Sequence, residues 1–199
     1  MSDIVRLNRR SVDVTVGLVA GLSEADLDRP TPCAGWTVRD LVEHQIVQNH
    51  GFAFAASGQP SELAFWQPKP MTSLGDYPAS ARAVVAAFAE LGVLERAFWL
   101  PEVRTSAPIP ARLAIGFHFI DCVVHGWDLA KAVGVPPRFD EDLLAACLPL
   151  TLAVPDTAEA RPPGKAFVRG VPVAEDAPVL DRIVAHLGRR PDWSPERAG

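Results

Sequence analysis

The segment FHFIDCVVHGWDLA (117–130) places two histidines and two aspartates in an otherwise apolar run. Apolar runs of this kind belong in protein cores, and cores exclude charged groups that have no partner. The segment lies in a predicted helix over residues 109–133, with Pro110 in its first turn and Gly134 at its end. The fold must therefore supply a partner for each buried polar side chain of this helix.

Three of these polar residues share one stripe of the predicted helix, because a helix turns by about 100° per residue. They are His118, Asp121 and His125. Asp121 and His125 are four residues apart, so their side chains are neighbours on one face. Two donors at this spacing can bind one divalent metal ion, which would offset the cost of burying a carboxylate among apolar residues. A hydrogen bond within the helix would also explain the pair.

A third metal ligand is expected from a facing helix, and His44 is the best of the remaining histidines. Thr37 and Asp40 resemble a capping box and predict that this second helix begins near residue 37. His50 falls on a different face of the same helix, and His186 suits a helix C-terminus, where the helix dipole favours it. His44 could instead be an ordinary core or surface histidine.

Helical periodicity recurs along most of the chain. The predicted helices cover residues 4–22, 37–57, 78–99, 109–133, 140–152 and 177–189. The segment KAFVRGVPV (165–173) breaks this pattern and predicts a short strand or a small β-hairpin. Long amphipathic helices joined by loops predict an all-α four-helix bundle over residues 1–155. Residues 156–199 are expected to form a C-terminal extension that packs on the bundle within the same domain.

Composition limits the classes of function that the chain can have. Its 199 residues carry a net charge of −5 and no basic stripe, which argues against a nucleic-acid partner. We find neither the roughly 18 apolar residues that a membrane span needs nor an N-terminal signal peptide, so we expect a cytoplasmic protein without a membrane partner. The cysteines, Cys33, Cys122 and Cys147, are few and widely spaced, which favours packed residues over disulfides or a nucleophile.

Two long motifs resemble a known family. TPCAGWTVRDLVEHQIVQNHGFA (31–53) resembles the signature of the mycothiol-dependent maleylpyruvate isomerase N-terminal family, within the DinB-like (YfiT-like) metalloenzyme group, and IDCVVHGWDLAKAVG (120–134) is similar to its second signature. The ending DRIVAHLGRRPDW (181–193) resembles an actinobacterial subgroup. The resemblance implies an antiparallel four-helix bundle with a divalent metal held by His44, Asp121 and His125. Asp121 departs from the pattern, since the characterised isomerase type carries Glu there.

Three nitrogen and oxygen ligands leave a coordination position open on a zinc ion, which is typical of a catalytic site. Two neutral histidines and one carboxylate leave a net positive charge that would hold a bound thiol or water as an anion. The resemblance implies mycothiol as the incoming thiol and a small electrophilic molecule as the second substrate. We therefore expect a thiol transferase or isomerase that uses zinc or nickel.

Other residues are candidates for the same pocket. Gln48 and Phe52 follow the ligand of the second helix by one and two turns, and Phe52 could form an apolar wall. His118 is a candidate proton carrier or further ligand, and the alternative is a buried ring that only packs. Asp128 could orient a histidine ligand by accepting its ring N–H. The alternative for Asp128 is a structural salt bridge, for example with Arg39.

Two other functions stay open from the sequence. A non-catalytic metal- or ligand-binding accessory module would keep the metal site without turnover, and a purely structural bundle would use the polar stripe only for packing. The isomerase type carries an additional C-terminal domain, whereas residues 135–199 here contain only short elements. Maleylpyruvate isomerase activity itself is therefore not expected. The apolar faces of the bundle would also allow a homodimer.

Overall fold

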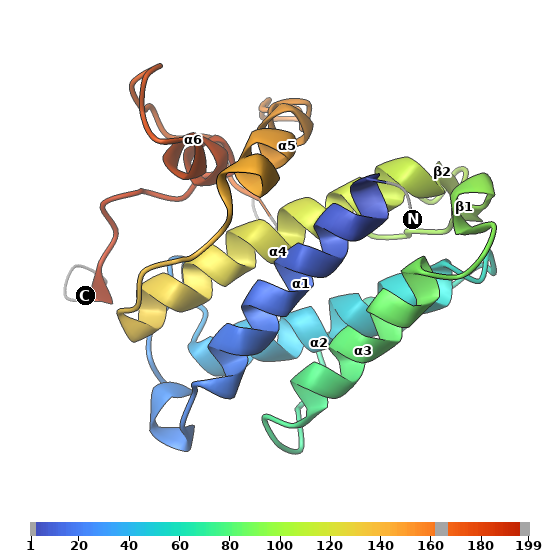
Figure 1. Cartoon of the computed structure of the whole chain (residues 1–199), viewed down its shortest axis with the longest axis horizontal. Coiled ribbons are helices and arrows are strands. Elements are labelled where there is room, and N and C mark those ends of the chain that lie inside the picture. Colours follow the sequence, from blue (N-terminus) through green and yellow to red (C-terminus); the bar gives the residue numbers. More distant parts are fainter. Residues whose placement is uncertain (1–2, 162–166, 196–199) are drawn as a thin grey trace.

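The computed structural model describes residues 3–161 and 167–195, and these are mostly helical. Four long helices form the bundle (Figure 1): α1 (Asp3–Ala20), α2 (Val38–Ala55), α3 (Asp76–Phe88) and α4 (Ala111–Val133). Two shorter helices, α5 (Glu141–Leu152) and α6 (Val179–His186), follow. Single 3-10 turns occupy Glu24–Asp26, Leu63–Trp66 and Val93–Glu95. The all-α bundle expected from the sequence is confirmed.

The start of α2 is fixed by its N-cap. The Thr37 hydroxyl accepts a hydrogen bond from the Asp40 amide, and the Asp40 carboxylate accepts one from the Thr37 amide. This reciprocal pair satisfies two amides that the first helical turn leaves unpaired. The predicted capping box is therefore confirmed, and it sets the register of the helix that carries His44.

The helices pack in pairs around a core that is mostly aliphatic and aromatic. Helix α1 runs along α4 and α2 runs along α3, while α5 and α6 pack on each other and on α4 (Figure 1). Helix α4 is covered on nearly all sides. Gly126 permits the close approach of α1, because a Cβ there would lie 2.9 Å from the Thr15 side chain. The long apolar helix that carries the polar stripe thus becomes the central helix of the bundle.

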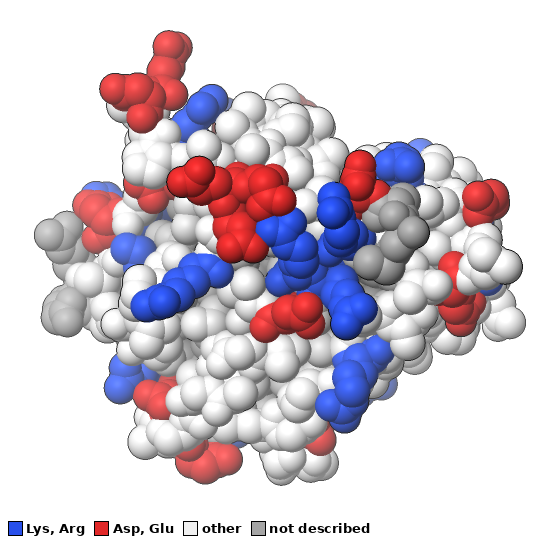
Figure 2. Space-filling view, viewed as in Figure 1, with Lys and Arg blue, Asp and Glu red and all other residues white. Residues whose placement is uncertain are grey.

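Helix α4 is long and apolar enough to cross a membrane, by length and composition only. Its most apolar window is, however, 83% buried inside the molecule, as expected for the core helix of a bundle. On the face drawn in Figure 2, acidic and basic side chains lie next to one another. Ion pairs of Arg10 with Asp140 and Asp142, at 2.6 and 2.7 Å, join α1 to the start of α5.

The third helix is shorter than predicted. It ends at Phe88 instead of continuing to residue 99, and Gly92 adopts a φ of +75° that right-handed helix does not allow. The chain then forms β1 (Ala97–Phe98), which pairs antiparallel with β2 (Ile109–Pro110) just before α4. Two-residue strands carry too little alternation for a sequence pattern to reveal them.

The C-terminal extension differs from the prediction in one respect. No strand is present at residues 167–173, so the predicted strand or hairpin does not form there, and its first residues lie outside the described part. The segment is instead held by side chains. Buried Arg161 donates hydrogen bonds to the carbonyls of Pro155, Val168 and His186. The division at residue 155 stays a prediction.

Candidate metal centre

The three predicted metal ligands meet between α2 and α4. The potential ligand atoms of His44, Asp121 and His125 all lie within 4.8 Å of one another. The two histidine rings meet edge to face with centroids 5.1 Å apart, and His125 Nε2 lies 3.3 Å from Asp121 Oδ1. The fold thus brings together the residues that the sequence proposed from two different helices, while metal binding itself stays a prediction.

Two ring nitrogens of this group lack a hydrogen-bond partner among the residues that the structure describes. They are Nε2 of His44 and Nε2 of His125, and both are buried, although the second still lies within ion-pair distance of Asp121. A buried polar atom without a partner costs about 1–3 kcal/mol, which a bound ligand would relieve. Two imidazole nitrogens and one carboxylate oxygen form a donor set that zinc accepts, with a coordination position left open. The residues present therefore fit a divalent transition metal.

The protonation states of the three side chains affect how the group would bind a metal ion. Burial lowers the pKa of His44 to about 4, so its ring is neutral near pH 7 and offers a lone pair. Burial by itself would raise the pKa of Asp121, but His125 outweighs it and the pKa falls below its usual range. Burial by itself would lower the pKa of His125, but Asp121 outweighs it and holds that pKa well above 6.5. A proton and a metal ion would therefore compete for this site.

Trp36 covers the two histidines from the loop before α2. Its ring centroid lies 5.0 Å from that of His44 and 6.3 Å from that of His125, over which it stacks. The loop is tight, because the Trp36 amide bonds the Cys33 carbonyl and the Trp36 carbonyl accepts from Thr31. We did not single out Trp36 from the sequence. Its place directly before the Thr37 cap was the signal that could have revealed it.

Asp128 supports His125 from the next turn of α4. Its Oδ2 lies 3.0 Å from His125 Nδ1, and the carboxylate is completely buried. The predicted contact therefore forms. The partner cation is Arg189, at 3.1 Å, and not Arg39, so the salt bridge suggested from the sequence was assigned to the wrong arginine. Arg189 lies 61 residues further along the chain, and no helical spacing could have indicated it.

Cys33 belongs to the same polar network. Its Sγ lies 3.1 Å from Asp128 Oδ2, 3.1 Å from Arg189 Nη2 and 4.0 Å from His125 Nδ1. We expected a packed loop residue, and the thiol indeed packs, but against charged groups. Cys33, His125 and Asp128 form a second group whose potential ligand atoms lie within 4.8 Å of one another. His125 is common to both groups.

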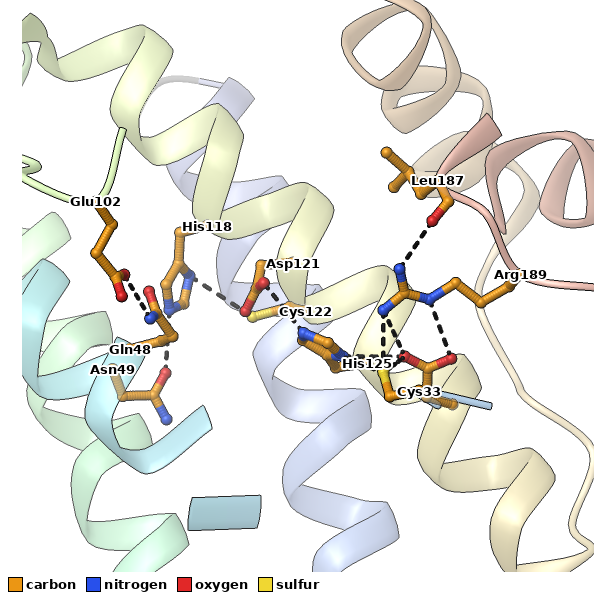
Figure 3. Close-up of polar contacts among 11 residues, drawn as sticks. Cys33, Gln48, Asn49, Glu102, His118, Asp121, Cys122, His125, Leu187 and Arg189 are labelled. Atoms are coloured by element: carbon orange, nitrogen blue, oxygen red, sulfur yellow. Dashed lines mark hydrogen bonds and ion pairs between the residues drawn. The ribbon is translucent and has the colours of Figure 1, made fainter. Parts of the chain in front are cut away.

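His118 has a different environment from His125, although both are buried in α4. Asn8 Nδ2 donates to His118 Nδ1 at 2.7 Å. On the other side of the ring, His118 Nε2 donates to Asn49 Oδ1 at 3.0 Å (Figure 3). Burial lowers the His118 pKa to about 4, which keeps the ring neutral. Both ring nitrogens are already hydrogen-bonded, which favours the packing alternative over the predicted catalytic role of His118.

The two residues predicted to line the pocket after His44 have other partners. Gln48 Nε2 donates to Glu102 Oε2 at 2.8 Å (Figure 3). Phe52 lies in the main core, edge-on to His118 with ring centroids 4.9 Å apart. Phe52 therefore makes core contacts, and its role as an apolar wall stays a prediction. Gln48 is tied to the segment after β1, and its binding role stays a prediction.

The remaining histidines lie outside the ligand group. His186 Nε2 bonds the Val154 carbonyl at 2.9 Å. His50 is exposed and lines a cavity of about 340 Å³ together with Phe65, Lys69 and Met71. None of the three candidate ligands lines that cavity. The choice of His44 among the histidines therefore agrees with the geometry.

The fold and the ligand group define a helical bundle with a candidate metal centre between two of its helices. The chain belongs to the mycothiol maleylpyruvate isomerase N-terminal domain family, whose sequence pattern matches residues 9–130. All three candidate ligands lie within this matched region, and Arg189 lies beyond it.

Two curated relatives and one solved structure are similar to the chain. Uncharacterized proteins of Mycobacterium tuberculosis, from strains CDC 1551 and ATCC 25618, are each 29% identical over 187 residues, which cover 94% of this chain and 98% of theirs. The crystal structure of the mycothiol-dependent maleylpyruvate isomerase superposes with a TM-score of 0.59 at 14% identity, over 76% of this chain and 67% of that chain. At this identity the likeness shows the fold alone.

Proposed function

We propose that the protein is a divalent-metal-dependent thiol transferase or isomerase that acts on a small electrophilic molecule with mycothiol as its thiol partner. The observation that carries the proposal is the buried Nε2 of His44, which has no hydrogen bond among the described residues, within ligand distance of His125 and Asp121. Membership in a family named for a mycothiol-dependent isomerase supports the thiol. His44, Asp121 and His125 would hold the ion, which we expect to be zinc or nickel.

The chain's own residues fix the electrostatics of the site. When bound, the metal would supply the positive charge that stabilises a thiolate at neutral pH. His44 offers a neutral nitrogen, and Asp121 offsets only one charge of a divalent ion. Asp128 accepts the Nδ1 hydrogen of His125 and so leaves Nε2 to bind. Trp36 packs against both histidine rings.

We also propose that the reaction takes place in the cytoplasm. Cys33, Cys122 and Cys147 are all free thiols in the structure. Free thiols of this kind are maintained in a reducing compartment, which is where a low-molecular-weight thiol co-substrate would be available. The apolar helix α4 does not argue otherwise, because it is buried within the bundle.

Metal analysis of the tag-free protein tests the first part of the proposal. We expect one zinc or nickel ion per chain, with an affinity that falls by roughly tenfold or more in His44→Ala and Asp121→Asn, because each removes one of three ligands. His50→Ala is the matched control, since His50 lies on the same helix but is exposed and away from the ligand group. Wild-type protein that binds no stoichiometric metal would overturn the proposal.

Mass spectrometry of reactions with mycothiol and a panel of small electrophiles tests the second part. We expect a thiol conjugate or an isomerised product with wild-type protein and none with His125→Ala. Metal binding without any turnover across the panel would instead establish the accessory-module alternative. Metal binding and thiol chemistry are tested independently, because metal content is measured on the protein without substrates.

A further inference from the structure

A buried ion pair joins the C-terminal extension to α4. Nη2 and Nε of Arg189 lie 3.1 and 3.4 Å from the two carboxylate oxygens of Asp128. Arg189 is 5% exposed and Asp128 is 0% exposed. Charged side chains are almost never buried this deeply unless they are paired. Removing one partner would leave the other charge uncompensated, so this pair is strongly constrained by the fold.

The end of α6 directs Arg189 to this position. Gly188 adopts a φ of +86°, and the amides of Gly188 and Arg189 bond the carbonyls of Ala185 and Val184. These are the two hydrogen bonds of a Schellman motif, which reverses the chain after a helix. A Cβ at position 188 would also clash with Val168, so glycine is required on two counts.

The guanidinium of Arg189 makes hydrogen bonds to several groups around it (Figure 3). Besides the bonds to Asp128, Nη1 donates to the Leu187 carbonyl at 2.8 Å and Nη2 donates to Cys33 Sγ at 3.1 Å. One face of the group lies over the ring of Phe167, 5.4 Å from its centroid. The positive charge is therefore fixed in place rather than free to swing toward solvent.

The Asp128 carboxylate determines which ring nitrogen of His125 carries a hydrogen. An ionised carboxylate can only accept hydrogen bonds, so His125 Nδ1, which lies 3.0 Å away, must carry its hydrogen. Nε2 is then the nitrogen that can bind an ion, and it faces Asp121. Arg189 contacts both carboxylate oxygens of Asp128 and so holds this acceptor opposite His125 Nδ1.

His125 nevertheless stands between two groups of potential metal ligands. One comprises His44 and Asp121 on the Nε2 side, and the other comprises Cys33 and Asp128 on the Nδ1 side. The second group contains a thiol, which binds zinc well. Cys33 Sγ and Asp128 Oδ2 instead contact the guanidinium of Arg189, so a positive charge is already present on this side of His125.

We propose that Arg189 is a positioning residue that confines metal binding to the Nε2 side of His125. It occupies the Cys33–Asp128 side with a fixed positive charge, and it holds Asp128 so that His125 presents Nε2 to His44 and Asp121. The inference rests on the metal centre proposed above and assigns part of its specificity to the C-terminal extension.

Cobalt titration of the full-length protein tests this role, because thiolate ligation gives a charge-transfer band in the near ultraviolet. Wild-type protein should bind Co²⁺ without that band. In Arg189→Met the band should appear, and it should vanish again in the double variant Arg189→Met/Cys33→Ser. Affinity at the Nε2 side should fall by roughly 10- to 100-fold in Arg189→Met. Arg189→Lys keeps the charge but not the forked geometry, so it should lack the band and lose less affinity.

Arg161→Met is the matched control for loosening of the extension. Arg161 is also a buried arginine, but it bonds backbone carbonyls such as Pro155 and Val168 and makes no contact with the ligand group. It should lower stability while leaving the cobalt spectrum unchanged. An Arg161→Met spectrum that matches that of Arg189→Met would overturn the proposal.

The remaining outcomes separate the two proposals. Wild-type protein that binds no Co²⁺ or Zn²⁺ would reject the metal centre itself. Wild-type binding together with an unchanged spectrum in Arg189→Met would reject only the role of Arg189. If Arg189→Met does not fold, the Cys33→Ser variant provides the test, because the change is nearly isosteric. A thiolate band that is present in the wild-type spectrum and absent in Cys33→Ser would overturn the proposal. Band-free spectra of both proteins would support it.

Discussion

His118 and His125, two buried histidines seven residues apart on α4, differ in how the fold satisfies them. His118 exchanges hydrogen bonds with Asn8 and Asn49, so its ring is complete within the protein. His125 has Asp128 at one nitrogen and leaves the other without a hydrogen bond among the described side chains. Of the two, only His125 therefore has a ring nitrogen that can bind a ligand. The two histidines differ in their hydrogen-bond partners, not in residue type.

His118 should make the protein less stable in acid. Its folded-state pKa is about 4 against 6.5 for an unperturbed histidine, because burial disfavours the charged ring. Between these two pH values the unfolded chain takes up a proton that the folded chain does not, so stability falls as pH falls from 6.5 to 4. In His118→Gln this part of the pH dependence should be absent. Urea unfolding of metal-free protein at several pH values measures it.

His50→Gln serves as the control for this prediction, because His50 is an exposed residue of α2. It should retain the wild-type slope of unfolding free energy against pH. Equal slopes in wild type and His118→Gln would contradict the assigned environment of His118. Metal content should stay unchanged in His118→Gln, which distinguishes a packed ring from a ligand.

At the level of elements, the site depends on how closely α4 approaches its neighbours. Gly126 directly follows His125 and lies against Thr15 of α1 and Phe139 before α5. The glycine therefore does not confer flexibility; it removes a side chain where two helices meet. The same contact fixes the rotation of α4 and hence the direction in which its polar stripe points.

Gly126→Ala should destabilise the protein by about 1–3 kcal/mol, because the added Cβ would lie 2.9 Å from atoms of both Thr15 and Phe139. Urea unfolding measures the change. Gly17→Ala is the matched control in α1, since no atom lies within 4 Å of the new Cβ. It should be neutral or stabilise by up to roughly 1 kcal/mol through helix propensity. Stability losses of the same size in both variants would show that packing at Gly126 is not the cause.

At the scale of the whole molecule, the candidate centre joins three parts of the chain that are remote in sequence. His44 comes from α2, Asp121 and His125 from α4, and Arg189 from the end of the extension. A ligand that binds only this assembled arrangement stabilises the folded state by mass action. Metal binding should therefore be visible in global unfolding and not only at the site.

Metal saturation should raise the melting temperature relative to chelator-treated protein. At a free metal concentration of about 100 times Kd the gain is roughly 2.7 kcal/mol, which corresponds to about 5–10 °C for a chain of this size. Differential scanning calorimetry with and without chelator measures it. His44→Ala should show almost no difference between the two conditions. A wild-type melting temperature that does not respond to chelator would favour the purely structural bundle.

Much of the fold was accessible from the sequence because its signals are local. Helix periodicity, the Thr37–Asp40 cap and the glycine after α4 act over one or two turns, and each is present in the structure. The third helix was extended too far: it ends at Phe88, and the positive φ of Gly92, which an apolar pattern does not reveal, is incompatible with a helix that continues to residue 99. The strands β1 and β2 were missed because their pairing is tertiary and each has only two residues.

For the candidate site, the sequence by itself determined that Asp121 and His125 share a face, because four residues span one helical turn. It also indicated His44 through the motif around it. Only the tertiary structure decided which polar groups are satisfied and which are not. The bonds of His118 to Asn8 and Asn49, the cover by Trp36 and the contact of Arg189 with Asp128 all join distant segments. Such contacts are set by packing in three dimensions, which the spacing of residues along one helix does not encode.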